Sequence, residues 1–271
     1  SAVAAEARKA LIAHDPVAKG WAGSMEDAYF TAFAADELAS HAELARRAQM
    51  QGGAAAETRV RPDRNAAENV VAAKDRRGLI ADLALAISGL GGNEVGARVF
   101  TSAQGQALDV FHVQDITGAP IGADNPRILR RLADAMEAAG KGEPPTFEPR
   151  KPQVLGRAAA FSITPTVMLD NDASEDATVV EASGRDRPGL LEALARAVAD
   201  AGLSIVSAHI DGYGERAVDA FYVQTPGGGK LTDARASNAL KAALMEVLED
   251  DEAGPSRGRP KLERARASVA R

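Results

Sequence analysis

The chain has 271 residues, of which 45% are hydrophobic and 4% aromatic, and it carries a net charge of −6. The length predicts more than one domain, and the acidic balance gives no general reason to expect nucleic acid or an anionic membrane as a partner. There is no cysteine, which excludes disulfides, cysteine nucleophiles and thiolate metal sites and fits a reducing compartment.

No targeting or membrane segment is evident from the sequence. No apolar run approaches the roughly 20 residues of a membrane-spanning helix. Ser1 opens a charged, alanine-rich stretch instead of a signal peptide. Because the first residue is not methionine, we expect a fragment or a processed chain, and we expect it to be cytoplasmic.

Residues 1–50 are predicted to be helical, because Ala, Leu, Glu and Arg dominate them and apolar positions recur every three or four residues. A proline and a glycine interrupt this pattern. Trp21, Tyr29 and Phe30 would cover more apolar surface than two helices can bury alone. We therefore expect the end of a larger helical domain, or a strut packed on the next domain of the chain. Residues 51–65 are predicted to be a linker.

The sequence then repeats itself over residues 66–140 and 176–250. Each copy predicts a strand, an Asp-Arg-x-Gly turn, an apolar helix, two strands joined by a tight turn, and a second amphipathic helix. In the first copy, Pro126 follows Asn125 at the start of the second helix, which is typical of an N-cap. The matched positions are Asp75/Asp186, Arg76/Arg187, Gly78/Gly189, Leu83/Leu194, Ala97/Ala208, Asp109/Asp219, Phe111/Phe221 and Gln114/Gln224.

Two further segments lie outside the repeats. Residues 141–175 form a connector that begins with a proline-rich stretch and contains a candidate extra strand in AFSITPTVMLDND. Residues 251–271 form a basic tail that we expect to be disordered and solvated.

The order of elements predicts an α+β fold, with two ferredoxin-like βαββαβ units in tandem after a helical segment. A strand-helix-strand crossover leaves its two strands parallel, and the tight turn adds an antiparallel neighbour. One such unit has an open sheet edge. Pairing two units would therefore join edges and extend the sheet.

The turn before the first helix of each copy is a candidate ligand site. Gly78 and Gly189 would let a ligand approach the backbone at a helix N-terminus, where unpaired N–H groups and a partial positive charge attract a carboxylate. Asp75 and Asp186 would either cap the helix or accept hydrogen bonds from a ligand ammonium group. Such a pair of features suits a free amino acid. The same pattern also suits an N-cap and turn that bind nothing.

The stretch DRPGLLEALARAVADAGLSIVSAHI, residues 186–210, resembles an ACT domain, a regulatory module that binds amino acids at domain interfaces. With ALDVFHVQD, YGERAVDAFYVQ and the preceding AYFTAFAADELASHAEL, residues 20–250 resemble the C-terminal part of the bifunctional uridylyltransferase/uridylyl-removing enzymes of the P-II nitrogen-signalling protein. The resemblance implies a tandem ACT pair that senses glutamine and controls a nucleotidyltransferase domain and a metal-dependent HD hydrolase domain.

Neither catalytic motif of that family occurs in the chain. The four histidines, His14, His41, His112 and His209, lack metal-ligand spacing, and no Gly-Ser run precedes paired aspartates. We expect no catalytic residue, metal or cofactor in this chain, with Mg²⁺ confined to catalytic domains of the parent family. The chain would then be the sensor end of a cut enzyme or a freestanding relative without a catalytic half.

The resemblance places ligand contacts on the turn, the first helical residues and the start of the following strand in each unit. The predicted ligand-binding residues are Asp75, Arg76, Arg77, Gly78, Leu79, Ile80, Asn93, Glu94 and Val95 in the first unit, and Asp186, Arg187, Pro188, Gly189, Leu190, Leu191, Ser204, Ile205 and Val206 in the second. The first unit departs from the family pattern, with Arg77 where the second has Pro188.

Three interpretations of the repeat stay open. The first is a glutamine sensor, the second is a structural pairing module without a ligand, and the third is an ACT pair for another small molecule or a docking surface for P-II. The expected partners are a free amino acid, P-II through the parent enzyme, and a second copy of the chain, with no nucleic acid and no membrane. Asp109 and Asp219 either hold an adjacent turn or face a ligand.

Overall fold

The computed structural model describes residues 1–143 and 163–250, which form an α+β fold around one eight-stranded sheet. The strands are β1 (Ala54–Arg61), β2 (Ala66–Lys74), β3 (Asn93–Thr101), β4 (Gln106–Gln114), β5 (Thr166–Asp170), β6 (Thr178–Arg185), β7 (Ser204–Tyr213) and β8 (Arg216–Gln224). The helices are α1 (Ala2–His14), η1 (Pro16–Ala18), α2 (Lys19–Ser24), α3 (Asp27–Ala32), α4 (Ala35–Met50), η2 (Pro62–Arg64), α5 (Leu79–Gly89), α6 (Pro126–Gly140), α7 (Leu190–Asp200) and α8 (Ala234–Glu249).

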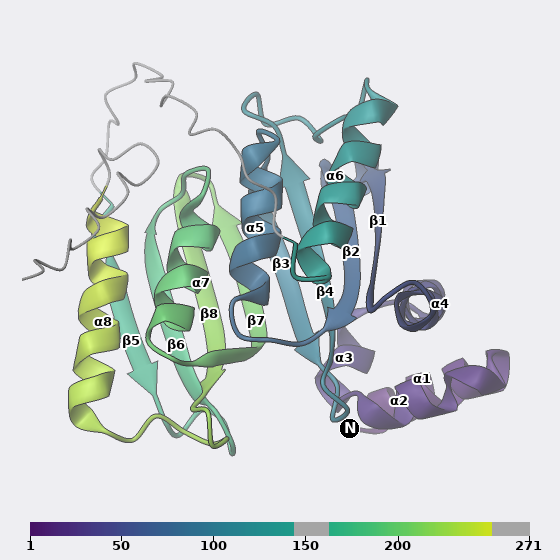
Figure 1. The fold of residues 1–271 in the computed structure, drawn as a ribbon, viewed down its shortest axis with the longest axis horizontal. Helices are drawn as coiled ribbons and strands as arrows, with labels where there is room; N and C mark the ends of the chain where they lie inside the picture. The colour runs from purple at the N-terminus through teal and green to yellow at the C-terminus, as the bar shows by residue number, and fades with distance from the viewer. Residues whose placement is uncertain (144–162, 251–271) are drawn as a thin grey trace, which may run out of the picture.

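The sheet joins two units of the same architecture. Its strand order is β1-β2-β4-β3-β7-β8-β6-β5, and the neighbouring strands pair antiparallel. Unit 1 comprises β1–β4 with α5 and α6, and unit 2 comprises β5–β8 with α7 and α8. Figure 1 shows these four helices on the same face of the sheet. The predicted α+β pair of ferredoxin-like units is therefore confirmed. Each unit has four strands, and the first of them, β1 or β5, precedes the repeated segment of the sequence.

The prediction of a linker over residues 51–65 is wrong, because residues 54–61 form the edge strand β1 and pair with β2 along their whole length. The sequence did not predict this strand, because AAAETRVR combines alanine, which has a low strand propensity, with charged residues. The candidate strand in the connector is confirmed as β5. The proline-rich start of the connector and the basic tail lie outside the described residues.

Two cores lie on opposite faces of the sheet. The first is continuous across both units and centres on Phe111 and Phe221, which are fully buried between the sheet and α5–α8. The second lies between α1–α4 and the other face of unit 1, where Tyr29 and Phe30 are buried against residues that include Leu108. Of the two alternatives predicted for the helical segment, the structure shows the packing on the domain that follows, and this packing involves unit 1.

Local sequence signals explain where several helices begin. Asn125 caps α6, since its side-chain oxygen accepts a hydrogen bond from the Arg127 amide at 3.1 Å, and Pro126 occupies the first turn as expected. Asp233 caps α8 by accepting from the Ala236 amide at 2.7 Å. Across residues 1–143 and 163–250, no helix combines the length and apolarity needed to cross a membrane.

The two units are related by an approximate twofold symmetry within the sheet. Strands β3 and β7 are equivalent in the repeat and pair with each other, with Arg98 opposite His209. Equivalent residues lie symmetrically about this pair, so that Ala97 faces Ile210 and Val99 faces Ala208. Helices α5 and α7, which are also equivalent, pack side by side over this junction. Joining β3 to β7 satisfies the backbone groups of two edges that would otherwise be open.

Candidate functional site: two recesses between the paired units

The Asp-Arg-x-Gly turn has the same conformation in both units. Gly78 and Gly189 are the N-caps of α5 and α7, and both have a left-handed backbone with φ of +85° and +83°. Only glycine adopts this conformation without a steric cost, which explains why it recurs. The interpretation of Asp75 and Asp186 as helix caps is wrong, because the cap position is occupied by the glycine three residues later.

The arginines of the two turns have matching structural contacts. Arg76 donates from Nη2 to the Ala139 carbonyl at 2.8 Å, and Arg187 donates from Nη2 to the Val247 carbonyl at 2.9 Å. Both carbonyls belong to the last turn of the second helix of the same unit, where intrahelical partners run out and the helix dipole is negative. Each arginine therefore anchors its turn to the neighbouring helix.

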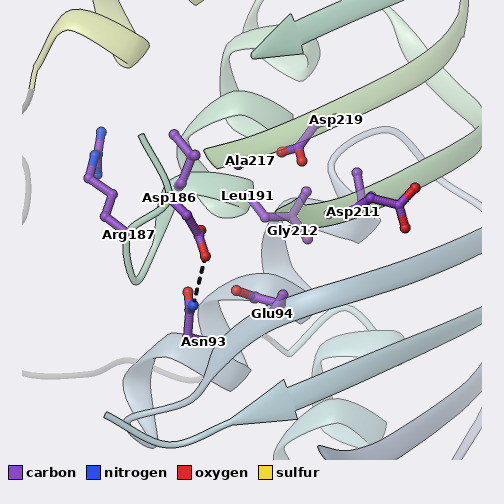
Figure 2. A pocket seen from close by; sticks show the side chains of 11 residues that line it. Asn93, Glu94, Asp186, Arg187, Leu191, Asp211, Gly212, Ala217 and Asp219 are labelled. Carbon is purple, nitrogen blue, oxygen red and sulfur yellow. Dashed lines mark hydrogen bonds between the residues drawn. The ribbon is translucent and has the colours of Figure 1, made fainter. Parts of the chain in front are cut away.

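The first recess, here called the acidic recess, lies where the turn of unit 2 meets the start of β3 in unit 1. Its lining residues are Asn93, Glu94, Asp186, Arg187, Leu190, Leu191, Ile210, Asp211, Gly212, Ala217 and Asp219. Asn93 donates from Nδ2 to Asp186 Oδ2 at 3.2 Å, so one hydrogen bond crosses between the units (Figure 2). A bulge after Glu94 interrupts the pairing of β3 with β4 at this point, as is frequent beside binding sites.

The acidic recess holds carboxyl groups that resist ionisation. Burial raises the pKa of Glu94 to about 8, and the nearby carboxylates of Asp186 and Asp219 add to the effect. Burial also raises the pKa of Asp219 to about 8. The pKa of Asp186 is raised by partial burial, although its hydrogen bond from Asn93 opposes the shift. A cationic or hydrogen-bond-donating group placed here would stabilise the charged carboxylates.

The second recess, here called the latch recess, lies where the turn of unit 1 meets the start of β7 in unit 2. Its lining residues are Asp75, Arg76, Gly78, Leu79, Ile80, Ala81, Ala195, Ala199, Leu203 and Ile205. Beside it, the buried carboxylate of Asp82 pairs with Arg76 at 2.7 Å and with Arg196 of the other unit at 2.9 Å. The chain itself thus supplies the cations at this recess.

Most of the predicted ligand-binding residues lie in one of the two recesses. Asn93, Glu94, Asp186, Arg187, Leu190 and Leu191 line the acidic recess, and Asp75, Arg76, Gly78, Leu79, Ile80 and Ile205 line the latch recess. The predicted positions outside both linings are Arg77, Val95, Pro188, Gly189, Ser204 and Val206. The structure therefore brings each turn together with the strand start of the other unit.

The sequence prediction omitted several lining residues that come from the second hairpin. In the acidic recess these include Asp211, Gly212, Ala217 and Asp219. The repeat did contain a signal for one of them, because Asp109 and Asp219 occupy equivalent buried positions on β4 and β8. Asp219 lines the acidic recess and Asp109 lines neither recess, although burial raises the pKa of both and the turn aspartate of the same unit, Asp75 or Asp186, adds to each shift.

The histidines form no metal centre in residues 1–143 and 163–250, where no cluster of three or more candidate ligands occurs. His41 is buried 3.2 Å from the Tyr29 hydroxyl, and burial lowers its pKa to about 4. His112 Nε2 lies 3.2 Å from Glu68, and His209 Nε2 lies 2.7 Å from Asp211. Each of these three histidines has an ordinary packing or surface contact.

Comparison with known proteins shows the family of the chain. The chain is 71% identical over 265 residues to the bifunctional uridylyltransferase/uridylyl-removing enzyme of Caulobacter vibrioides, covering 98% of the chain. The chain corresponds to one segment of the bifunctional uridylyltransferase/uridylyl-removing enzymes. The enzyme of this name from Phenylobacterium zucineum is 63% identical over 267 residues, and that from Azospirillum brasilense is 37% identical over 230 residues, or 83% of the chain.

The chain spans 28% of the length of the Caulobacter vibrioides uridylyltransferase/uridylyl-removing enzyme and 24% of the Azospirillum brasilense one. No family model matches the sequence. Among solved structures, aspartate kinase from Synechocystis aligns with 68% of the chain and 26% of its own length, at 21% identity and a TM-score of 0.37.

Proposed function

We propose that this chain is the amino-acid-sensing module of a bifunctional uridylyltransferase/uridylyl-removing enzyme, with glutamine as the ligand. In this proposal it controls the uridylylation and deuridylylation of P-II by Mg²⁺-dependent catalytic domains outside the chain. The observation that carries it is the position of the two turns, each of which faces the other unit across a recess. A ligand held there contacts both units at once.

The acidic recess has the chemistry of an amino-acid site. Its floor includes the N-terminus of α7, where backbone N–H groups have no partner within the helix and attract a carboxylate. Its walls carry the carboxyls of Glu94, Asp186 and Asp219, which suit an ammonium or amide donor. A zwitterion with a neutral side-chain amide, such as glutamine, offers all of these groups.

The packing supports a route by which the ligand would influence the rest of the enzyme. Helices α1–α4 pack on the open face of unit 1, and unit 2 contacts unit 1 through β3–β7 and α5–α7. A ligand that binds one arrangement of the units better than another shifts the equilibrium between them. Because the helical segment is packed on unit 1, a change in how unit 2 lies against unit 1 would be transmitted through it.

Calorimetric titration of the chain with glutamine tests the proposal, with glutamate, serine and phenylalanine as comparisons. We expect glutamine-selective binding, and we expect Asp186→Ala to weaken it by at least about tenfold, since a charged hydrogen bond contributes roughly 1.5–3 kcal/mol. Asp200→Ala, at an exposed position at the end of α7, is the matched control and should bind as the wild type does.

Two results would count against the proposal. If the folded chain binds none of the four amino acids, the repeat is better explained as a structural pairing module. If it binds another of them in preference to glutamine, the sensor is retained and the ligand is wrong. Whichever amino acid binds, its control of catalysis is tested by assaying P-II uridylylation by the full-length enzyme with and without that amino acid, because this control requires the other domains.

A further inference from the structure

The acidic recess contains two buried carboxyl oxygens that the chain leaves without a partner. Glu94 is 7% exposed and Asp219 is 2% exposed. Glu94 Oε1 and Asp219 Oδ1 have no hydrogen-bond partner among residues 1–143 and 163–250, and the same is true of both carboxyl oxygens of Asp109, the residue of unit 1 equivalent to Asp219. Buried polar groups are nearly always satisfied, and a group left unsatisfied typically costs about 1–3 kcal/mol. Two such oxygens in one recess therefore indicate a missing donor.

Three further acidic groups lie near these two carboxyls. Asp186 approaches from the turn, Glu192 from α7 and Asp211 from β7, and these negative groups disfavour ionisation of Glu94 or Asp219. Figure 2 shows Glu94, Asp186 and Asp219 around the same space.

Arg187 is the one cationic residue among the described residues that line this recess, and its side chain extends away from the carboxyls in Figure 2. Its Nη2 donates instead to the Val247 carbonyl at 2.9 Å. Asp211 is paired with Arg98 at 3.4 Å and lies 2.7 Å from His209, whereas no cation among the described residues is paired with Glu94 or Asp219.

The latch recess provides an internal comparison at equivalent positions. Asp82, the fourth residue of α5, is neutralised there by Arg196, the seventh residue of α7, at 2.9 Å. In the acidic recess the corresponding residues are Ala193 and Leu85, so no such pair can form. Glu94 at the start of β3 and Ile205 at the start of β7 occupy equivalent positions, so the latch recess has an apolar side chain where the acidic recess has a carboxyl. The latch recess thus has an ion pair between the units beside it, and the acidic recess has none at the equivalent positions.

We propose that Glu94 and Asp219 form an ammonium subsite in the acidic recess, with Asp186 and Asn93 at its rim. This inference rests on the proposed amino-acid-sensing function and assigns its ammonium recognition to named residues. An ammonium group suits the site because it carries three N–H donors and no acceptor. When it binds, the carboxyls transfer their protons to the buffer and become the carboxylates that accept its hydrogen bonds.

The test is calorimetric titration at pH 7 in phosphate and in Tris, two buffers that differ in their heat of ionisation. The ligands are glutamine and 4-carbamoylbutanoate, which is glutamine without its ammonium group. We expect wild type to release between one and about two protons per glutamine, because both carboxyls are largely protonated at this pH. The analogue should bind at least about tenfold more weakly and release none.

Glu94→Gln and Asp219→Asn should each weaken glutamine binding by about tenfold or more and remove about one released proton. Asp109→Asn is the matched control, since it removes the equivalent buried carboxyl of unit 1, which lines neither recess. It should keep wild-type affinity and proton release. Melting temperatures of all three variants establish that each is folded.

The outcomes separate this inference from the function on which it rests. Wild-type binding of glutamine with no proton release, or with unchanged affinity in both carboxamide variants, overturns the ammonium subsite and leaves the sensor intact. Equal binding of glutamine and its des-amino analogue does the same. Failure of the folded wild type to bind any amino acid overturns the sensor together with the subsite.

Discussion

The buried acids of the recess should make the chain less stable as the pH rises above neutrality. Glu94 has an ordinary pKa of 4.5 that burial raises to about 8, and Asp219 has an ordinary pKa of 3.8 that burial also raises to about 8. Between these values the folded chain holds protons that the unfolded chain has lost. The free energy of unfolding must therefore fall as the pH rises through this window.

The magnitude is set by the two shifts. Stability changes by about 1.4 kcal/mol per pH unit for each proton held only by the folded chain. Between pH 5 and pH 8 each carboxyl should thus contribute a loss of roughly 3 kcal/mol. Because the two groups disfavour each other's ionisation, the double variant Glu94→Gln/Asp219→Asn should recover less than the sum of the two single variants.

Urea denaturation followed by circular dichroism at pH 5, 6, 7 and 8 measures this effect. The double variant should have a flatter profile than wild type and be more stable at pH 8. Glu181→Gln, at an exposed position on β6, is the control and should keep the wild-type slope. If the double variant loses as much stability between pH 5 and pH 8 as wild type, these carboxyls are ionised in the folded chain and the reasoning is refuted.

Three further substitutions test other parts of the structure. Arg196→Gln should lower the unfolding free energy by about 1–3 kcal/mol, because it leaves the buried Asp82 carboxylate with one cation in place of two, and equal urea midpoints would contradict this. Gly189→Ala should cost roughly 1–2 kcal/mol through its positive φ, whereas Gly227→Ala, which meets neither strain nor atoms within 4 Å, should be nearly neutral in the same titration. Tyr29→Ala should cost about 3–5 kcal/mol, since this fully buried ring packs between the helical segment and unit 1, and a loss below about 1 kcal/mol would mean that the two are weakly coupled.

Much of the fold could be predicted because its signals are local. The helix α6 shows its start in an asparagine followed by a proline, and the turn glycines mark the starts of α5 and α7. The strand β1 could not be predicted in this way. It is built from alanines and charged residues, and only pairing with β2 and burial under α4 and α6 make it a strand.

The sequence by itself determined that there are two like units, each with a glycine turn at the start of an apolar helix, because a repeat and a 3.6-residue period are visible within short windows. Only the tertiary structure decided which turn meets which strand. The hydrogen bond between Asn93 and Asp186 joins residues 93 positions apart, and the ion pair between Asp82 and Arg196 joins residues 114 positions apart. No local pattern encodes such contacts, since they arise when β3 and β7 pair and bring the two units together. The two recesses differ chemically because different residues occupy equivalent positions, with the ion pair of Asp82 and Arg196 beside one recess and no such pair at the other.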